Sequence, residues 1–279
     1  MNSTPVRTIL SIWSWFVLGL SVLIYTPIVA IVRVATWPFD RGAYAAGYVF
    51  RKVVMPNSYL NPLWTFKTSG TVPDDMRHPY VVVSNHESFV DMVLISHLPL
   101  EMKWMSKSEI MKIPFLGWMM RLSRDIRLVR GDAKSAVQAL ADCRERLEKK
   151  TSVMIFPEGS RSKTGDLREF KAGAFKLAIE GGYPILPMAV HGTRDCLRKH
   201  DWRQGRATAE VRVLEPIPTE GMTNADLPEL RDRVRDLIIA TRQELRDEHG
   251  WTPPVDDQSS EDDAGENSSD GSTDAGDAA

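Results

Sequence analysis

With 279 residues, the chain can bury one sizeable core and leave room for a small appendage. A hydrophobic content of 43% and a charged content of 26% are ordinary for a globular protein. The two cysteines, Cys143 and Cys196, lack the C-x-x-C spacing. This argues against a disulfide framework or a zinc site and favours a reducing compartment.

The net charge of −2 conceals an uneven distribution along the chain. Residues 252–279 carry nine acidic side chains and neither Lys nor Arg. Without them, 35 basic side chains face 28 acidic ones, so the remainder carries a charge of about +7. A basic body suits an anionic membrane surface or a phosphate-bearing substrate, and a merely solvated surface is the alternative.

The N-terminal segment, residues 8–32, is 25 residues long, lacks charge and is rich in Ile, Leu, Val and Trp. It is long enough to cross a bilayer of roughly 30 Å and too long for the apolar core of a signal peptide. Pro27 also permits a bent segment that dips into one leaflet and returns. A second helical pattern over residues 40–54 completes a predicted two-helix anchor in membrane lipid. Basic residues follow the apolar segment and predict the cell inner membrane, with the C-terminal body on the cytoplasmic side: Arg33, Arg41, Arg51 and Lys52.

Beyond the anchor, strand-like apolar runs alternate with helical patterns, which predicts an α/β fold with a mixed sheet flanked by helices. Strands are expected at residues 81–84, 103–106, 126–129, 153–156, 185–190 and 209–214. Helices are expected from near residue 88 and over residues 113–123, 132–150, 172–180 and 227–249. The predicted organisation is an anchor over residues 1–58, a globular domain over residues 59–251 and an acidic, disordered tail over residues 252–279.

A His and an Asp follow the apolar run of residues 80–84. On one continuous helix, the five positions between His86 and Asp91 would point their side chains about 140° apart. They can meet if His86 lies in the loop after the strand and Asp91 in the first turns of the helix. The Asp would then fix the imidazole tautomer, and the free nitrogen could take a proton from a substrate hydroxyl. A loop His with a helix-capping Asp is the alternative, and Glu87 and Ser88 are also plausible capping residues.

A Pro-Glu-Gly-Ser-Arg turn follows the strand predicted at residues 153–156. It brings backbone N–H groups, a hydroxyl, the Glu158 carboxylate and the Arg161 guanidinium to one place, and such turns bind oxyanions. Arginine can meet two phosphate oxygens at once. A Pro-Gly turn that carries a surface ion pair is the alternative.

Two further groups of residues are candidates for substrate contact. Basic residues surround the strand predicted at residues 126–129, and Arg130, at its exit, is the best placed for phosphate. An apolar group could line an acyl-chain groove, although such a group is more often core: Phe115, Trp118, Met119 and Met120. No metal site is expected, because His86 has no second His at ligand spacing.

These residues carry a family resemblance. The chain resembles the glycerolipid acyltransferases of the lysophosphatidic acid acyltransferase type over roughly residues 60–220, together with the apolar N-terminus. Four motifs of that family occur in order: N-H-x4-D at residues 85–91, a block ending in a phosphate-binding Arg at residues 126–130, F-P-E-G-T-R-S at residues 156–162 and an apolar block with a Pro at residues 184–190. Ser160 replaces the usual Thr, and the aromatic that often opens the second block is absent.

The resemblance implies 1-acylglycerol-3-phosphate O-acyltransferase activity, which converts lysophosphatidic acid to phosphatidic acid. His86 would be the general base on the free hydroxyl, and Asp91 would orient it. The donor would be acyl-CoA or acyl carrier protein, with no other cofactor and no nucleic-acid partner. The residues that would bind the acceptor are Glu158, Gly159, Arg161, Arg130 and Lys107.

Other readings of the same motifs stay open. The acceptor could be glycerol 3-phosphate, a lysophospholipid with another head group or an acylated amino acid. The site could belong to a hydrolase that uses water in place of an alcohol. A non-catalytic membrane-binding scaffold is the third alternative, and it would have no reason to retain His86 and Asp91 together with Glu158 and Arg161.

Overall fold

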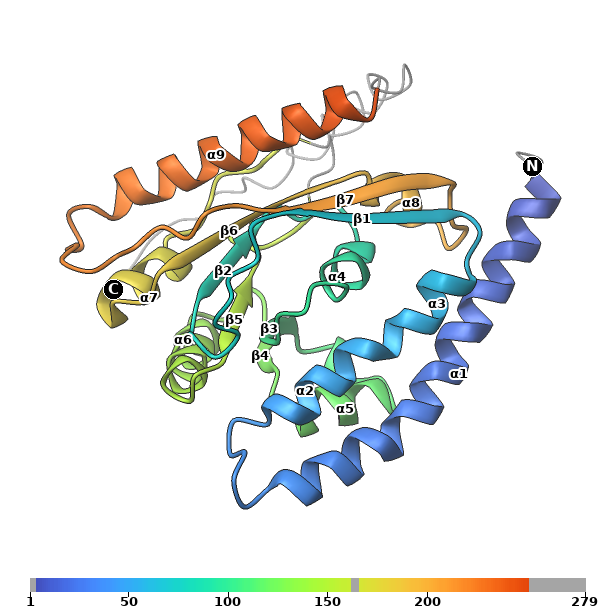
Figure 1. The fold of residues 1–279 in the computed structure, drawn as a ribbon, viewed down its shortest axis with the longest axis horizontal. Coiled ribbons are helices and arrows are strands. Elements are labelled where there is room, and N and C mark those ends of the chain that lie inside the picture. The colour runs from blue at the N-terminus through green and yellow to red at the C-terminus, as the bar shows by residue number, and fades with distance from the viewer. Residues whose placement is uncertain (1–3, 162–165, 251–279) are drawn as a thin grey trace, which may run out of the picture.

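A computed structural model describes residues 4–161 and 166–250 of the chain. The strands of its central sheet are β1 (Trp64–Gly70), β2 (Val81–Ser84), β3 (Met102–Lys107), β4 (Ile126–Leu128), β5 (Ser152–Ile155), β6 (Ile185–His191) and β7 (Ala207–Val213). They form one seven-stranded sheet in the order β1-β7-β6-β2-β5-β3-β4 (Figure 1). Strands β2 to β6 run parallel, whereas β7 pairs antiparallel with β6 and β1 runs parallel to β7. The sheet is therefore mixed, as the sequence predicts.

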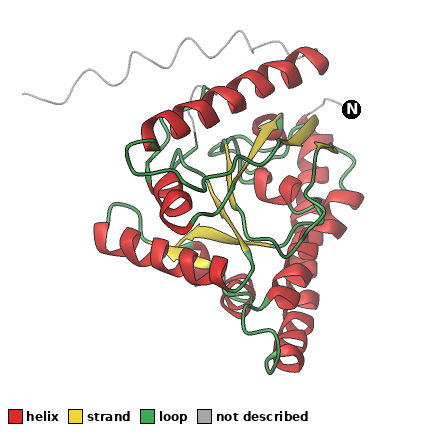
Figure 2. Ribbon diagram, turned by 60° about the vertical axis from the view of Figure 1, so that its left-hand side comes forward, coloured by secondary structure: helices red, strands yellow, loops and turns green. Residues whose placement is uncertain are grey.

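Helices cover both faces of this sheet (Figure 2). Their bounds are α1 (Thr4–Thr36), α2 (Tyr44–Arg51), α3 (Met55–Leu60), α4 (Val90–Ile95), α5 (Leu116–Leu122), α6 (Ala133–Glu148), α7 (Gly173–Gly181), α8 (Thr193–Cys196) and α9 (Leu227–Glu248), with 3₁₀ turns η1 (Lys52–Val54) and η2 (Ile110–Lys112). Successive strand residues point to opposite faces, so Val82 packs with α4 while Val81 and Val83 pack with α6, α7 and α9. All three valines are fully buried, which explains why β2 is apolar on both faces.

The register of the sheet determines where the candidate residues meet. Strands β2 and β5 are parallel neighbours, and Val83 pairs with Ile155. Their carboxyl ends therefore lie at the same edge of the sheet. The segments that follow, residues 85–89 and 156–161, leave that edge side by side, which is where open α/β sheets place their ligands.

Most predicted elements are present, with boundaries that differ by a few residues. Helix α5 starts at Leu116, three residues later than predicted, because Phe115 has a φ of 61° and cannot continue a helix. Asp132 caps α6 by accepting the backbone N–H groups of Lys134 and Ser135. The predicted apolar group of the α5 region divides: Met119 and Met120 are buried core, whereas Phe115 and Trp118 are exposed. Strand β1 and the short helices α3 and α8 were not predicted.

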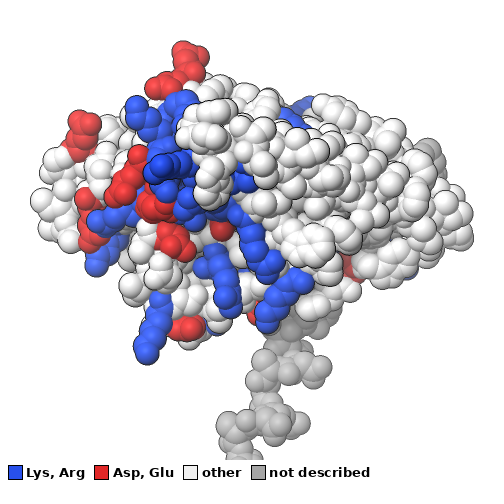
Figure 3. Space-filling model, turned by 90° about the horizontal axis from the view of Figure 1, so that it is seen from below, with Lys and Arg blue, Asp and Glu red and all other residues white. Residues whose placement is uncertain are grey.

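Helix α1 has two different sides. One side packs against α2, α3 and α5, and the other exposes large apolar residues: Ile9, Ile12, Phe16, Leu20, Leu23, Ile31 and Val34. By length and composition, α1 is the one helix in the described residues that could cross a membrane. Seen from below, the molecule has most of its visible Lys and Arg side chains in one area, with Asp and Glu among them, and a broad, largely uncharged area beside it (Figure 3).

The N-terminal end of α1 is tied to the globular domain by polar contacts. The Arg7 guanidinium donates to the carbonyls of Arg203 and Gln204, each at 2.8 Å, and lies 3.2 Å from the Asp201 carboxylate. The Trp15 indole donates to the Trp202 carbonyl at 2.8 Å. Helix α1 therefore lies along the domain instead of projecting away from it.

Helix α2 is joined to β3 by buried charges. Lys103 Nζ lies 2.7 Å from Glu101 Oε1 and donates to the Ala43 carbonyl at 2.7 Å, and both charged side chains are fully buried. Arg51 forms a two-pronged ion pair with Asp125. At Gly47 of α2, a Cβ atom would overlap the Glu101 carboxylate, so only glycine lets the helix approach this closely. We call Arg51, Glu101, Lys103 and Asp125 the anchor network.

Two predictions on domain organisation, the acidic tail and the boundary after residue 58, are not tested by the contacts described above. The acidic tail, residues 252–279, lies outside the described residues. The boundary placed after residue 58 stays a prediction, and α3 crosses it.

Candidate active site

The end of β2 is fixed by Asn85, whose side chain makes hydrogen bonds of the kind that a strand backbone makes. Asn85 donates its side-chain amide to the Val190 carbonyl and accepts the Val190 N–H, both at 2.8 Å. These two bonds extend the β2–β6 pairing with side-chain atoms. They hold the chain at the exact point where it leaves the sheet, so the next residue, His86, starts from a fixed position.

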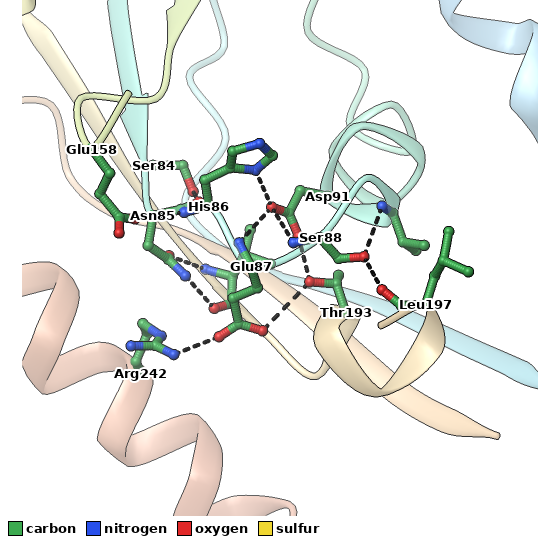
Figure 4. A network of polar contacts seen from close by, with 12 residues as sticks. Ser84, Asn85, His86, Glu87, Ser88, Asp91, Glu158, Thr193, Leu197 and Arg242 are labelled. Atoms are coloured by element: carbon green, nitrogen blue, oxygen red, sulfur yellow. Dashed lines mark hydrogen bonds and ion pairs between the residues drawn. The ribbon is translucent and has the colours of Figure 1, made fainter. Parts of the chain in front are cut away.

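His86 lies in the loop after β2, and Asp91 is the second residue of α4. The imidazole Nδ1 lies 2.7 Å from Asp91 Oδ2, and Asp91 is fully buried (Figure 4). The same oxygen accepts the backbone N–H groups of Glu87 at 2.8 Å and Ser88 at 3.1 Å. Because an ionised carboxylate can only accept, Nδ1 of the neutral ring carries the proton and Nε2 keeps a lone pair for a substrate. The loop-and-helix geometry that the spacing requires is thus the observed one.

The imidazole ring is also held from one face. It stacks on the Phe156 ring, with centroids 4.1 Å apart and an interplanar angle of 19°. Phe156 is the first residue after β5, so the stack joins the two segments that leave the sheet edge. The stack and the Asp91 bond together restrict both rotations of the His86 side chain.

Glu158 lies close to His86 but contacts its backbone. Its Oε1 accepts the His86 N–H at 2.8 Å, and its Oε2 accepts the Arg168 N–H at 3.1 Å. Burial raises the pKa of this carboxyl, and the two N–H donors oppose that rise. The contacts observed for Glu158 join loops, and the acceptor-binding role expected of it stays a prediction.

A cavity of about 220 Å³ opens beside the His86 ring. It brings together five of the residues that the sequence marks: His86, Lys107, Arg130, Gly159 and Arg161. Among the described residues that line it, there is no Asp or Glu, so three cationic side chains face a space without a fixed counter-charge inside it. The nearest carboxylate to Lys107 is on the exposed Glu109, 3.5 Å away. Such a cavity favours an anionic group.

An apolar cavity of about 110 Å³ adjoins the first one. The two share part of their walls: Phe89, Met92, Trp104, Ser106 and Ile110. The second cavity continues among side chains of α1, α2 and α5, including Leu18, Phe50 and Met120. A cationic space beside the imidazole and an apolar space beyond it suit an amphipathic substrate.

Sequence reasoning missed a layer of residues behind Asp91. Asp91 Oδ1 accepts the hydroxyl of Thr193, from the first turn of α8, and Glu87 forms a buried ion pair of 2.5 Å with Arg242 of α9. By sequence, Glu87 was a plausible capping residue; in the structure, it is an ion-pair partner of Arg242. Burial raises the pKa of Glu87, and the Arg242 charge opposes this. No local pattern could have found these contacts, because Thr193 and Arg242 lie 102 and 155 residues from their partners.

Within residues 4–161 and 166–250, no group of three or more His, Cys, Asp or Glu side chains could hold a metal ion. Asp91 and Glu87 are both engaged with protein donors. His86 and Asp91 form an imidazole–carboxylate pair, and the imidazole faces a cationic cavity.

Comparison with known proteins places this domain in a family. Residues 65–191 match a family model described as Acyltransferase. The solved structure of the 1-acyl-sn-glycerophosphate (LPA) acyltransferase PlsC from Thermotoga maritima superposes with a TM-score of 0.71 over 88% of this chain and 98% of that one, at 24% identity. That structure shares the fold. All four motifs named above lie within the residues that match this family model, so the resemblance seen in the motifs is confirmed.

Several relatives have names of one kind. The chain is 34% identical to the 1-acyl-sn-glycerol-3-phosphate acyltransferase of Saccharomyces cerevisiae over 185 residues, which is 65% of this chain and 60% of that protein. It is 36% identical to the human alpha enzyme of that name over 171 residues, 60% of each chain. It is 44% identical to the chloroplastic BAT2 enzyme of Brassica napus over 161 residues, 57% of this chain and 45% of that one. The match thus spans 60% or less of the length of these relatives.

Proposed function

We propose that this protein transfers a fatty acyl group from a thioester to the free hydroxyl of 1-acyl-glycerol-3-phosphate and so makes phosphatidic acid. The observation that carries the proposal is the His86–Asp91 pair at the wall of a cavity that also receives Lys107, Arg130 and Arg161. The pair supplies a base, and the three cations suit a phosphate. The names of the relatives support the same acceptor.

The proposed chemistry needs one base and balances without a cofactor. His86 Nε2 takes the proton of the acceptor hydroxyl as its oxygen attacks the thioester carbonyl. The tetrahedral intermediate collapses with cleavage of the C–S bond, and the leaving thiolate takes the proton back from Nε2. Asp91 keeps the proton on Nδ1 and stabilises the imidazolium that forms between the two steps. General-base assistance of this kind is worth about 10²- to 10⁴-fold in rate.

The cationic side chains of the cavity would bind the phosphate of the acceptor. Arg161 offers the two-pronged contact that phosphate accepts, and Lys107 and Arg130 add positive charge around it. Gly159 has a φ of 71° and lets the turn approach the cavity without a side chain. Glu158 would support the turn from behind through its two backbone bonds.

The apolar cavity and α1 suggest where the lipid comes from. An acyl chain that enters the apolar cavity would lie between α4 and the N-terminal helices. The exposed apolar side of α1 would rest in the membrane, so that the acceptor reaches the site from the lipid phase. We propose a location at the cell inner membrane with the catalytic domain on the cytoplasmic side, where acyl-CoA and acyl carrier protein are available as donors.

An acceptor and donor screen tests this function. Membranes that contain the protein are incubated with radiolabelled acyl-CoA or acyl carrier protein and with lysophosphatidic acid, glycerol 3-phosphate or neutral lysolipids. Labelled phosphatidic acid, dependent on added lysophosphatidic acid and absent with His86→Ala, is the expected result. Thioester consumption that needs no lysolipid would identify a hydrolase instead, and labelling of another acceptor at a higher kcat/KM would replace the proposed substrate.

A further inference from the structure

The buried carboxylate of Asp91 has one oxygen directed at the catalytic imidazole and one directed away from it. Oδ2 receives three donors, namely His86 Nδ1 and the backbone N–H groups of Glu87 and Ser88. Oδ1 receives the hydroxyl of Thr193 and, within residues 4–161 and 166–250, has this one donor. Rotation of the carboxylate would exchange the two oxygens, so the contact at Oδ1 helps to decide what His86 meets.

A backbone turn that requires glycine places Thr193 beside Asp91. Strand β6 ends at His191, and Gly192 follows with a φ of 87°. A Cβ atom at Gly192 would collide with the Thr208 carbonyl of β7, so another residue would push the turn away. Thr193 then opens α8 with a fully buried side chain that points at Asp91 (Figure 4).

The Thr193 hydroxyl stands between two acidic side chains and has one proton to give. Glu87 Oε2 is 3.4 Å from it, and Asp91 Oδ1 is much closer, so the proton goes to Asp91. Glu87 is meanwhile held by Arg242 at 2.5 Å. The hydroxyl therefore serves the catalytic carboxylate, while α9 neutralises the second acid behind it.

We infer that Thr193 is a positioning residue for the acyl-transfer step: its hydroxyl holds Asp91 so that Oδ2 faces His86 Nδ1. The inference rests on the proposed function for its kinetic consequences. It predicts that loss of the hydroxyl slows the chemical step without weakening either substrate, because neither Thr193 nor Asp91 lines the substrate cavity.

Three variants isolate the hydroxyl from the shape of the side chain. Thr193→Val keeps the shape and removes the hydroxyl, and Thr193→Ser keeps the hydroxyl. Thr219→Val is the matched control, because Thr219 is equally buried but donates to the carbonyls of Ala178 and Tyr183, away from the site. We expect Thr193→Val to lower kcat by about 10- to 100-fold with both KM values within about two-fold, whereas Thr193→Ser recovers most of it and Thr219→Val leaves kcat unchanged. Equal kcat values for Thr193→Val and Thr193→Ser would overturn the inference.

A double-mutant cycle shows whether Thr193 acts through Asp91. In an Asp91→Asn background, adding Thr193→Val should change kcat by less than about two-fold, because the carboxylate it positions is already gone. If the two effects multiply, Thr193 acts by another route and the inference fails. Melting temperatures of all variants identify any that lose activity by unfolding.

A measurement without substrate separates this inference from the proposed function. In ¹⁵N-histidine-labelled protein, the Nδ1–H of His86 bonded to Asp91 should give a downfield ¹H resonance, which His86→Ala assigns. Thr193→Val should shift or broaden this resonance, and Thr193→Ser should retain it. If the resonance responds in this way but wild-type protein acylates no acceptor, the proposed function is wrong and the positioning role stands. If wild-type protein is active and the resonance is unchanged in Thr193→Val, the positioning role is wrong.

Discussion

Two buried networks of charged and polar residues join distant parts of this chain: one is closed within the protein, and the other opens onto a cavity. The anchor network joins α2 to β3 and β4, and each of its charges faces another within the protein. The second, which we call the site network, joins the segment after β2 to α8 and α9: His86, Glu87, Asp91, Thr193 and Arg242. Its outermost member, His86, lines a cavity, and within residues 4–161 and 166–250 its Nε2 has no hydrogen-bond partner.

This difference separates stability from chemistry. In a closed network, removal of one charge leaves its partner buried and unpaired, which costs folding free energy. In the site network, His86 at the open end contributes little to folding stability, and its removal should mainly lower the rate of catalysis. Each prediction below tests one side of this comparison.

The largest effect is expected at the open end of the site network. His86→Ala should lower acyl transfer by about 10³-fold or more, because the described residues that line the cavity include no other His and no Asp or Glu to act as the base. The melting temperature should stay close to that of the wild type, since Asp91 keeps Thr193 and two backbone donors. Initial rates with lysophosphatidic acid and a thermal melt check both parts. Turnover at the wild-type rate would remove His86 from the mechanism.

The opposite result is expected in the anchor network. Lys103→Met should cost about 3–5 kcal/mol in the free energy of unfolding, because it leaves the buried Glu101 carboxylate without its closest cation, and Arg51 at 3.7 Å is then its remaining ion-pair partner. Adding Glu101→Gln should restore much of that loss, and Lys112→Met, on an exposed side chain, serves as control. Denaturant unfolding measures the free energies, and kcat per folded molecule should stay near that of the wild type. A loss of kcat without a loss of stability would contradict the comparison.

A titratable residue at the rear of the site network should make stability depend on pH. Burial, together with the charges of Arg242, Arg246 and His249, lowers the pKa of His191 to about 4, and Glu210 opposes this. Between pH 6.5 and 4, His191 is therefore protonated in the unfolded chain but neutral in the folded protein. The folding stability consequently falls as the pH falls. The loss of folding stability due to this one group reaches about 3 kcal/mol below pH 4.

Unfolding free energies measured between pH 7 and pH 4 test this pH dependence. His191→Gln should flatten the curve over that window, and His200→Gln, at an exposed position, should leave the curve unchanged. An unaltered slope in His191→Gln would show that His191 takes up its proton in the folded protein as easily as in the unfolded chain.

The same contrast explains which parts of the molecule the sequence could predict. Strands β2 and β5 are short apolar runs, so their ends, and hence His86 and Arg161, could be located without coordinates. Strand β1 was not predicted because its sequence, WTFKTSG, is mostly polar and only Trp64 is buried. A strand at the edge of a sheet needs little apolar surface, and local periodicity then gives no signal.

The site was predictable in its front layer only. The spacing of His86 and Asp91 required a loop followed by a helix, and that geometry follows from local rules. Thr193 reaches Asp91, and Arg242 reaches Glu87, from elements more than 100 residues away, so only the tertiary fold reveals these contacts. The anchor network could not be predicted for the same reason, since Arg51 and Asp125 lie 74 residues apart.

The smallest effect tests the rim of the cavity, where the site network gives way to the substrate. Arg161→Lys keeps the charge but loses the fork that meets two phosphate oxygens, so it should raise the KM for the phosphate-bearing acceptor. The loss should be about 2–3 kcal/mol, or roughly 30- to 150-fold in kcat/KM for that substrate. The KM for the acyl donor should change far less. Arg168→Lys is the matched control, because its guanidinium contacts Ser160 and does not line the cavity. Steady-state kinetics with each substrate varied in turn decide the matter: a raised donor KM with an unchanged acceptor KM would assign this turn to the thioester and leave the phosphate to Lys107 and Arg130.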